Sequence, residues 1–158
     1  MIKYSNSLEL LIEKDLELFI ESFKTKVEHK LKTLECRTEM QGDCIAFHRI
    51  VRYFPLSGPG KNEILKLLRD GSIEIRKIGP VKIEIKWVVK LEVLLFISAC
   101  IGFVAGLGFG FVYSSIPIII IGGISFFLIA YFIGYIIIRS QIDEIVLTAI
   151  DNSPITNT

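Results

Sequence analysis

The chain has 158 residues, of which 51% are hydrophobic, and its 18 basic and 17 acidic side chains give a formal net charge of +1. A mean hydropathy of +0.54 is too high for an ordinary soluble domain of this length. Up to Lys90 the chain has 17 basic and 13 acidic side chains, and this net charge of about +4 is too mild to indicate nucleic-acid binding, so we expect no nucleic acid among its partners.

The charged residues are unevenly distributed along the chain. Seventeen of the eighteen Lys and Arg residues lie at or before Lys90, and residues 93–138 contain no charged side chain. This pattern predicts a soluble domain over residues 1–90, a membrane segment over 91–139 and a tail over 140–158. The first thirty residues lack the uninterrupted apolar core of a signal peptide, so we expect the soluble domain to stay in the cytosol.

The soluble domain begins with a predicted helix. From Ser7 to about Thr33 the apolar residues follow helical spacing, with Ser7 as the N-cap. A pattern of period two is also present, because charged residues alternate with Phe23, Thr25, Val27, His29 and Leu31. This leaves a second interpretation open, in which the helix ends near Ser22 and a strand follows.

Two hairpins are predicted after this helix. In the first, residues 34–40 and 44–53 alternate around a Gly42-Asp43 turn, and in the second, residues 73–76 and 81–89 alternate around Gly79-Pro80. Between them we expect a loop at 57–60 and a short helix over 62–70, which Gly71 ends. The predicted fold class is therefore α+β, with a helix packed on a mostly antiparallel four-stranded sheet.

The membrane segment divides into two apolar stretches, 93–112 and 118–138. Each has about the 20 residues that a helix needs to cross a hydrocarbon layer of about 30 Å. The small and polar residues of 113–117, with Pro117 at the start of the second stretch, suit a connecting turn. The sequence therefore predicts a hairpin of two transmembrane helices.

Basic residues close to the hairpin give its orientation. They precede the first helix and follow the second, and the connecting turn carries none, so we expect both termini in the cytoplasm and the hairpin in a bacterial inner membrane. Four side chains are expected at the membrane interface, with the indole at headgroup depth: Trp87, Lys86, Lys90 and Arg139. In the tail, Ile142, Ile145, Val146 and Ile150 predict a short amphipathic segment that lies on the membrane or on the domain.

Small residues recur at every fourth position of the first apolar helix: Ser98, Gly102, Gly106, Gly110 and Ser114. Such a face has almost no side chains, so the backbone of another helix can approach closely. The favoured partner is the second helix of the same hairpin, and the alternative is a neighbouring chain. Neither apolar stretch contains an ionisable Asp, Glu, His, Lys or Arg, which argues against a proton relay or an ion site.

The cysteines and histidines suggest no chemistry. If Met40 pairs with Cys44 across the first turn, Cys36 falls opposite His48, which would bring together side chains that can bind a soft metal. Four ligands at short chelating spacing are absent, however, and no residue in the sequence is placed to orient a catalytic base. We therefore expect no catalytic residue, no metal and no cofactor.

Three segments carry a resemblance to a known group of proteins: residues 42–53 (GDCIAFHRIVRY), 70–75 (DGSIEI) and 81–86 (VKIEIK), followed by two apolar helices. In this order they resemble small bacterial proteins with two transmembrane helices and an N-terminal cytoplasmic domain, whose function is unassigned. The resemblance covers most of the chain from about residue 35. It implies the same topology and no activity, and the helix expected between the hairpins departs from it.

These features favour a non-enzymatic membrane adaptor or an accessory subunit of a larger bacterial membrane complex. An immunity-type inhibitor has the same features. The alternative is a homo-oligomeric pore or channel in which the glycine faces pack several hairpins around a lumen, although neither helix has a polar stripe to line it. The expected partners are membrane lipids together with another membrane protein or a second copy of the chain.

Overall fold

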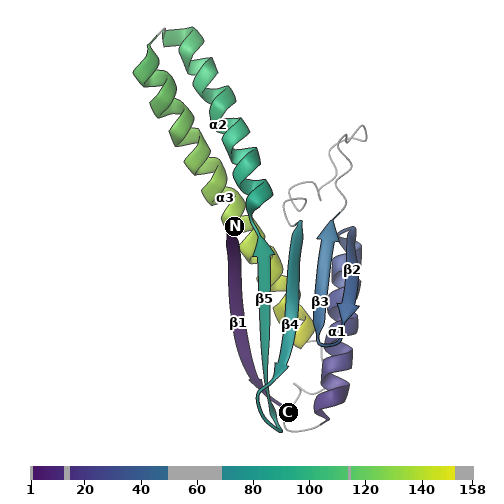
Figure 1. Cartoon of the computed structure of the whole chain (residues 1–158). Coiled ribbons are helices and arrows are strands. Elements are labelled where there is room, and N and C mark those ends of the chain that lie inside the picture. The colour runs from purple at the N-terminus through teal and green to yellow at the C-terminus, as the bar shows by residue number, and fades with distance from the viewer. Residues whose placement is uncertain (1, 13–14, 50–68, 114, 152–158) are drawn as a thin grey trace.

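The computed structural model describes residues 2–12, 15–49, 69–113 and 115–151. Figure 1 shows a sheet with helices behind it and a pair of long helices that projects from one end. In chain order the elements are β1 (Lys3–Leu11), α1 (Leu16–Thr33), β2 (Cys36–Gln41), β3 (Cys44–Arg49), β4 (Asp70–Lys77), β5 (Lys82–Lys90), α2 (Glu92–Tyr113) and α3 (Ile116–Asp151).

The strands of the described residues form one sheet in the order β1-β5-β4-β3-β2, and every neighbouring pair is antiparallel. The α+β layout followed by two apolar helices agrees with the prediction, but the sheet has five strands and not four. The additional strand is β1, which pairs with β5 from Lys3 opposite Lys90 to Leu11 opposite Lys82.

Strand β1 corrects the predicted start of the first helix, because Ser7 lies inside the strand and caps no helix. Leu8, Leu10 and Ile12 point toward the core at every second position, and Leu11 is 75% exposed. Over so few residues the helical and the alternating pattern overlap, and the hydrogen bonds that β5 offers decide for the strand.

Helix α1 begins at Leu16, after Asp15 has turned the chain with a positive φ of 42°. It runs without interruption to Thr33, so the interpretation that ended it near Ser22 is wrong. Its buried face consists of Phe19, Ile20, Phe23, Val27 and Leu31. These five positions have the spacing of a single helical stripe, which explains why the helix persists through the alternating segment.

Both predicted hairpins are present among the described strands, and Gly42 supplies the positive φ of 60° in the first turn. The register there differs from the one considered for a metal site. Cys44 is opposite Gln41 and His48 is opposite Arg37, so Cys36 faces Arg49 instead of His48. The side chains of Cys36 and His48 therefore lie on opposite faces of the sheet, since successive residues of a strand point to alternate faces.

The segment between the hairpins is described only in part, because the predicted loop at 57–60 and most of the predicted helix over 62–70 lie outside the described residues. Asp70 already belongs to β4, so no helix extends to it. Gly71 lies inside the strand and does not end a helix. A Cβ at Gly71 would lie 2.5 Å from the Val88 carbonyl oxygen and would overlap the Phe47 ring, which explains why glycine fits this position.

The core lies between one face of the sheet and two helices, α1 and the end of α3 (Figure 1). Strand β5 contributes alternate residues, Ile83, Ile85, Trp87 and Val89, and all four are buried. Leu91 alone separates β5 from α2, and its amide nitrogen donates a 3.0 Å hydrogen bond to the Ile2 carbonyl. The sheet therefore continues into the helical pair without a flexible linker.

Helices α2 and α3 pack antiparallel, and both are long and apolar enough to cross a membrane. Helix α3 has 36 residues, which corresponds to about 54 Å at 1.5 Å per residue. Residues 140–151 of the predicted tail continue this helix, and the rest of the tail lies outside the described residues. Its expected amphipathic residues, Ile142, Ile145, Val146 and Ile150, are buried against the domain.

Candidate functional site at the junction of the sheet and the helical pair

The described part of the chain joins its two structural units through helix α3. From Ile116 to about Ile133 most of the large apolar side chains of the helix are exposed, and from Ile138 onward one face of it belongs to the core of the sheet domain. Because the helix has no break between these parts, a rotation of the helical pair must move the domain with it.

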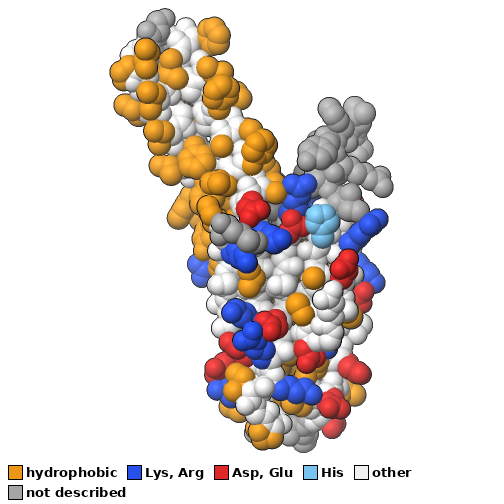
Figure 2. All heavy atoms as spheres, viewed as in Figure 1, with side chains coloured by type: hydrophobic (Ala, Val, Ile, Leu, Met, Phe, Trp, Pro, Cys, Tyr) orange, Lys and Arg blue, Asp and Glu red, His pale blue; other side chains and the backbone are white. Residues whose placement is uncertain are grey.

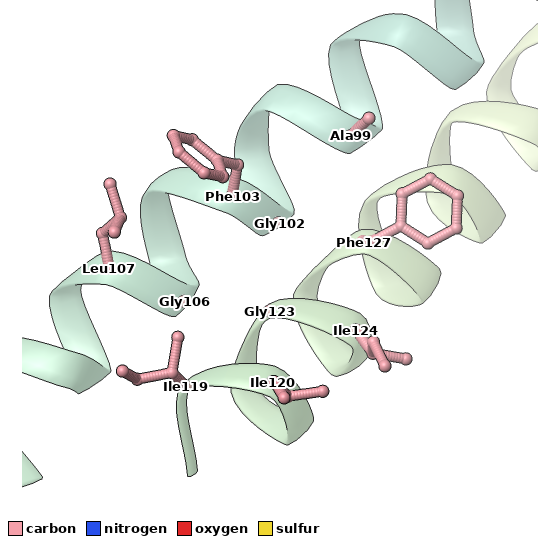
Figure 3. Close-up of a pocket in the computed structure, with 10 residues that line it drawn as sticks. All are labelled: Ala99, Gly102, Phe103, Gly106, Leu107, Ile119, Ile120, Gly123, Ile124 and Phe127. Atoms are coloured by element: carbon pink, nitrogen blue, oxygen red, sulfur yellow. The ribbon is translucent and has the colours of Figure 1, made fainter. Parts of the chain in front are cut away.

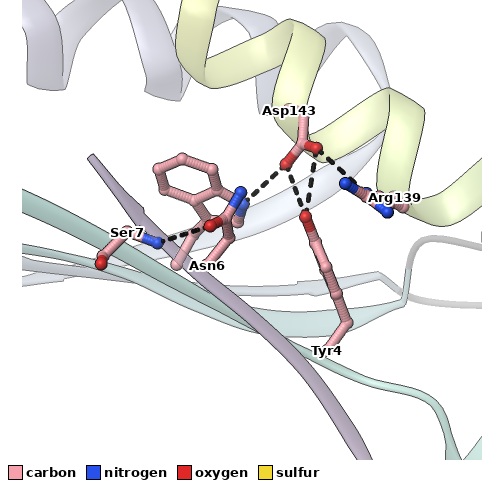
Figure 4. Close-up of polar contacts among 6 residues, drawn as sticks. Tyr4, Asn6, Ser7, Arg139 and Asp143 are labelled. Atoms are coloured by element: carbon pink, nitrogen blue, oxygen red, sulfur yellow. Dashed lines mark hydrogen bonds and ion pairs between the residues drawn. The ribbon is translucent and has the colours of Figure 1, made fainter.

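Asp143 is the centre of a polar cluster where α3 meets the sheet. Its Oδ1 accepts a 2.9 Å hydrogen bond from Nε1 of Trp87 in β5 and a 3.0 Å bond from the Tyr4 hydroxyl in β1, which is also 3.1 Å from Oδ2. Figure 4 shows the Tyr4 hydroxyl and Arg139 converging on this carboxylate. Hydrogen bonds to a charged acceptor are each worth about 1.5–3 kcal/mol, so the cluster fastens α3 to two strands.

Two further contacts surround the carboxylate. Nε of Arg139, one helical turn before Asp143, lies 3.7 Å from Oδ2, and the Tyr4 ring meets Tyr135 edge to face with 5.9 Å between ring centroids. Burial, followed by the hydrogen bond to Asp143, raises the pKa of the Tyr4 hydroxyl above its usual value of 10.0. The hydroxyl therefore remains a donor to Asp143 throughout the physiological pH range.

No pattern in the sequence indicates this cluster. Asp143 was one acidic residue of a predicted tail, and Tyr4 preceded the first predicted element. Trp87 was expected at headgroup depth, but its side chain is only 3% exposed and its polar edge binds Asp143. An indole enclosed in this way does not face lipid, and its burial follows from its inward position in β5.

Of the other three side chains expected at a membrane interface, Lys90 and Arg139 lie where the sheet meets the helical pair, whereas Lys86 lies in the middle of β5. Lys86 is on the outer face of the sheet, opposite Glu74, and Lys90 is the exposed last residue of β5. Arg139 follows the apolar part of α3, and its side chain is 58% exposed. Contact of these three cations with lipid headgroups stays a prediction.

The glycine face of α2 packs against α3 of the same chain (Figure 3). A Cβ at Gly102 would lie 2.6 Å from the Gly123 carbonyl oxygen, and one at Gly106 would lie 3.0 Å from that of Ile119. Gly110 faces the Ile119 side chain and Ser98 is fully buried, whereas Ser114 lies outside the described residues. The contacts are those of the favoured alternative, in which the face receives the second helix of its own hairpin.

Beside this contact the two helices leave a shallow groove of about 350 Å³. Its wall is apolar and includes Phe103, Leu107, Ile120 and Ile124 (Figure 3). No polar side chain lines it, so nothing in the groove would orient a polar substrate.

The chain matches no protein-family model, no curated protein and no solved structure. In the described part of the chain, no three His, Cys, Asp or Glu side chains lie close enough together to hold a metal ion. Cys36 is buried, and its burial raises the pKa of the thiol, which makes it a poor nucleophile.

Proposed function

We propose that the chain is a two-pass integral membrane protein whose cytoplasmic domain acts as an adaptor or accessory subunit of a larger bacterial membrane complex. One observation carries the proposal. Helix α3 runs without a break from an exposed apolar segment into the core of the sheet domain, so the domain has a fixed position relative to the helical pair.

The exposure of the apolar side chains supports a membrane location. The core helix of a soluble protein is mostly buried, but none of the most apolar stretch of α3 is buried, and only 22% of that of α2 is. Phe111 is 87% exposed, and Phe96, Phe103 and Phe132 are also exposed. Apolar surface of this extent is unfavourable in water and favourable in lipid.

The distribution of basic residues supports a cytoplasmic domain. Lys90 and Arg139 flank the helical pair on the domain side, whereas Ser115 and its neighbours at the far end carry no charge. Basic residues near the ends of membrane helices remain on the cytoplasmic side. We accordingly place both termini in the cytoplasm and the hairpin in the inner membrane.

The fixed position of the domain favours a docking role. A rigid domain presents the same surface at a constant height above the membrane, which lowers the entropic cost of binding a membrane partner. The outer face of the sheet, on which Figure 2 shows many charged side chains, is available for such a contact. The pore alternative has less support, because the glycine faces that would join several hairpins are occupied by the intrachain contact.

Cysteine labelling tests the topology. In a full-length chain with its three cysteines replaced, Ser115→Cys should react with an impermeant maleimide in intact spheroplasts. Glu39→Cys, on the exposed face of β2, should react only after lysis. Labelling of Glu39→Cys in intact spheroplasts, or of neither variant at any stage, would contradict the proposed orientation.

Purification tests the adaptor role. The full chain, extracted in a mild detergent, should co-purify with an unrelated membrane protein at fixed stoichiometry, as measured by mass spectrometry and light scattering. A complex that contains only copies of this chain would support the pore alternative instead.

A further inference from the structure

The outer face of the sheet carries a pair of lysines at the end from which the helical pair emerges. Lys3 begins β1 and Lys90 ends β5, and the register places them directly opposite each other. Both side chains are exposed, and neither forms an ion pair with any described residue. Like charges in directly opposite positions destabilise a sheet.

The backbone hydrogen bonds bring these two side chains close together. The Leu91 amide donates to the Ile2 carbonyl at 3.0 Å, and the Ile12 amide donates to the Val81 carbonyl at 2.8 Å. The backbone bonds of this ladder therefore join the even-numbered residues of β1 to β5. Lys3 and Lys90 form a pair without backbone bonds, in which Cα atoms are only about 4.5 Å apart.

Three other cations on the same sheet face lie close to a carboxylate or directly opposite one. Lys82 lies 2.5 Å from a carboxylate oxygen of Glu9, Arg76 lies 2.9 Å from one of Glu74, and Lys86 is directly opposite Glu74. Two described carboxylates lie near the lysine pair: Asp70, which is next to Lys90 in the register of β4 and β5 and forms an ion pair with His48, and Glu92, an exposed residue in the first turn of α2. Glu92 forms no ion pair with either lysine among the described residues, and its charge suits the positive end of the helix.

The lysine pair lies where a membrane surface would meet the domain. Leu91 follows Lys90 directly, and the exposed apolar side chains of α2 begin at Phe96. On the other helix Gly134 packs against Leu94, so Arg139 lies at about the level of Lys90. In Figure 2 the apolar helical pair ends where the charged side chains of the domain begin.

We propose that Lys3 and Lys90 together bind the phosphate group of an anionic phospholipid in the cytoplasmic leaflet, with Arg139 as a further cation at the same level. This inference rests on the membrane insertion proposed above. A phosphate between the two ammonium groups replaces their mutual repulsion by two attractions. Each basic residue near an anionic membrane surface contributes about 1 kcal/mol, which is about a fivefold change in affinity per residue.

The test uses the full chain in detergent micelles and in nanodiscs, with bound lipid counted by native mass spectrometry. The wild-type chain should retain phosphatidylglycerol in preference to phosphatidylcholine, and Lys3→Gln with Lys90→Gln should reduce that preference by about 30-fold. A matched control, Lys77→Gln with Lys82→Gln, removes the same charge from the opposite end of the sheet and should keep the preference.

Thermal unfolding separates lipid binding from a structural role. In neutral detergent the Lys3→Gln/Lys90→Gln variant should unfold at the same temperature as the wild type or higher, because a repulsion has been removed. Added phosphatidylglycerol should stabilise only the wild type and the control. A lower unfolding temperature in neutral detergent, or a double variant that still prefers phosphatidylglycerol, would overturn the proposal.

The source of the phosphate is tested separately with glycerol 3-phosphate, which should leave the unfolding temperature unchanged if the ligand is a membrane lipid. Stabilisation by glycerol 3-phosphate as strong as that by phosphatidylglycerol would overturn the lipid assignment. Failure of the membrane insertion itself would appear differently, as a chain that does not enter nanodiscs at all.

Discussion

The indole nitrogen of Trp87 donates a 2.9 Å hydrogen bond to Oδ1 of Asp143, which lies 56 residues later in the chain. Trp87 belongs to the strand that enters the helical pair, and Asp143 belongs to the helix that leaves it. The bond therefore joins the two ends of the hairpin to each other and to the sheet. Tyr4 extends the same cluster to the edge strand β1.

Asp143→Ala should destabilise the junction by about 3 kcal/mol, because it leaves the buried Trp87 N–H and the Tyr4 hydroxyl without their acceptor. Chemical denaturation in detergent measures the loss, and Trp87, the single tryptophan, reports it by fluorescence. The neighbouring exposed residue provides the control, since Glu144→Ala should change stability by less than about 0.5 kcal/mol. A loss of stability in Asp143→Ala that is as small as the loss in Glu144→Ala would show that the cluster contributes nothing.

Tyr4→Phe should alter how stability depends on alkaline pH. The pKa of Tyr4 is raised in the folded state by burial and by the hydrogen bond to Asp143. The folded state thus holds the phenolic proton more tightly, so this stabilisation is complete below the unfolded pKa of about 10 and is lost as the pH rises above it. Unfolding midpoints between pH 8 and 11 should fall more steeply for the wild type than for Tyr4→Phe; parallel curves would contradict this.

Two glycines of α2 should respond in opposite ways to the same substitution. A Cβ at Gly102 would lie 2.6 Å from the Gly123 carbonyl oxygen, whereas one at Gly108 would meet nothing within 4 Å. Gly102→Ala should therefore cost about 1–3 kcal/mol by overpacking, and Gly108→Ala should be neutral or stabilising. Thermal unfolding in detergent measures both, and size exclusion of the folded fraction should show an unchanged assembly. Loss of a partner by folded Gly102→Ala would instead place a second chain on this face.

Fluorescence quenching should confirm the position of Trp87. Because its side chain is 3% exposed, quenchers attached at shallow and at deep positions of the lipid should both have little effect on its emission. Asp143→Ala should red-shift the emission as water enters the junction. Strong quenching by the shallow quenchers alone would contradict this burial. It would show that the indole lies at the membrane interface, as its position in the sequence predicts.

Much of the fold follows from local patterns in the sequence. Residues 93–112 and 118–138 are mostly apolar and carry no charged side chain, so no partner is needed to predict two long helices there. The hairpins around Gly42 and Gly79 were also predictable, because each turn and its two strands are close in sequence. The apolar residues of helix α1 form a single stripe, and their helical spacing continues to Leu31.

Strand β1 and the polar cluster depended on partners far along the chain. Residues 7–12 fit a helix and a strand almost equally well, and their pairing with β5, more than seventy residues later, decides between the two. The sequence by itself therefore determined the apolar hairpin and the locally paired strands. Only the tertiary structure decided that α3 continues into the core and that Asp143 accepts the bonds of Trp87 and Tyr4, because a carboxylate acquires its role from the side chains that folding brings around it.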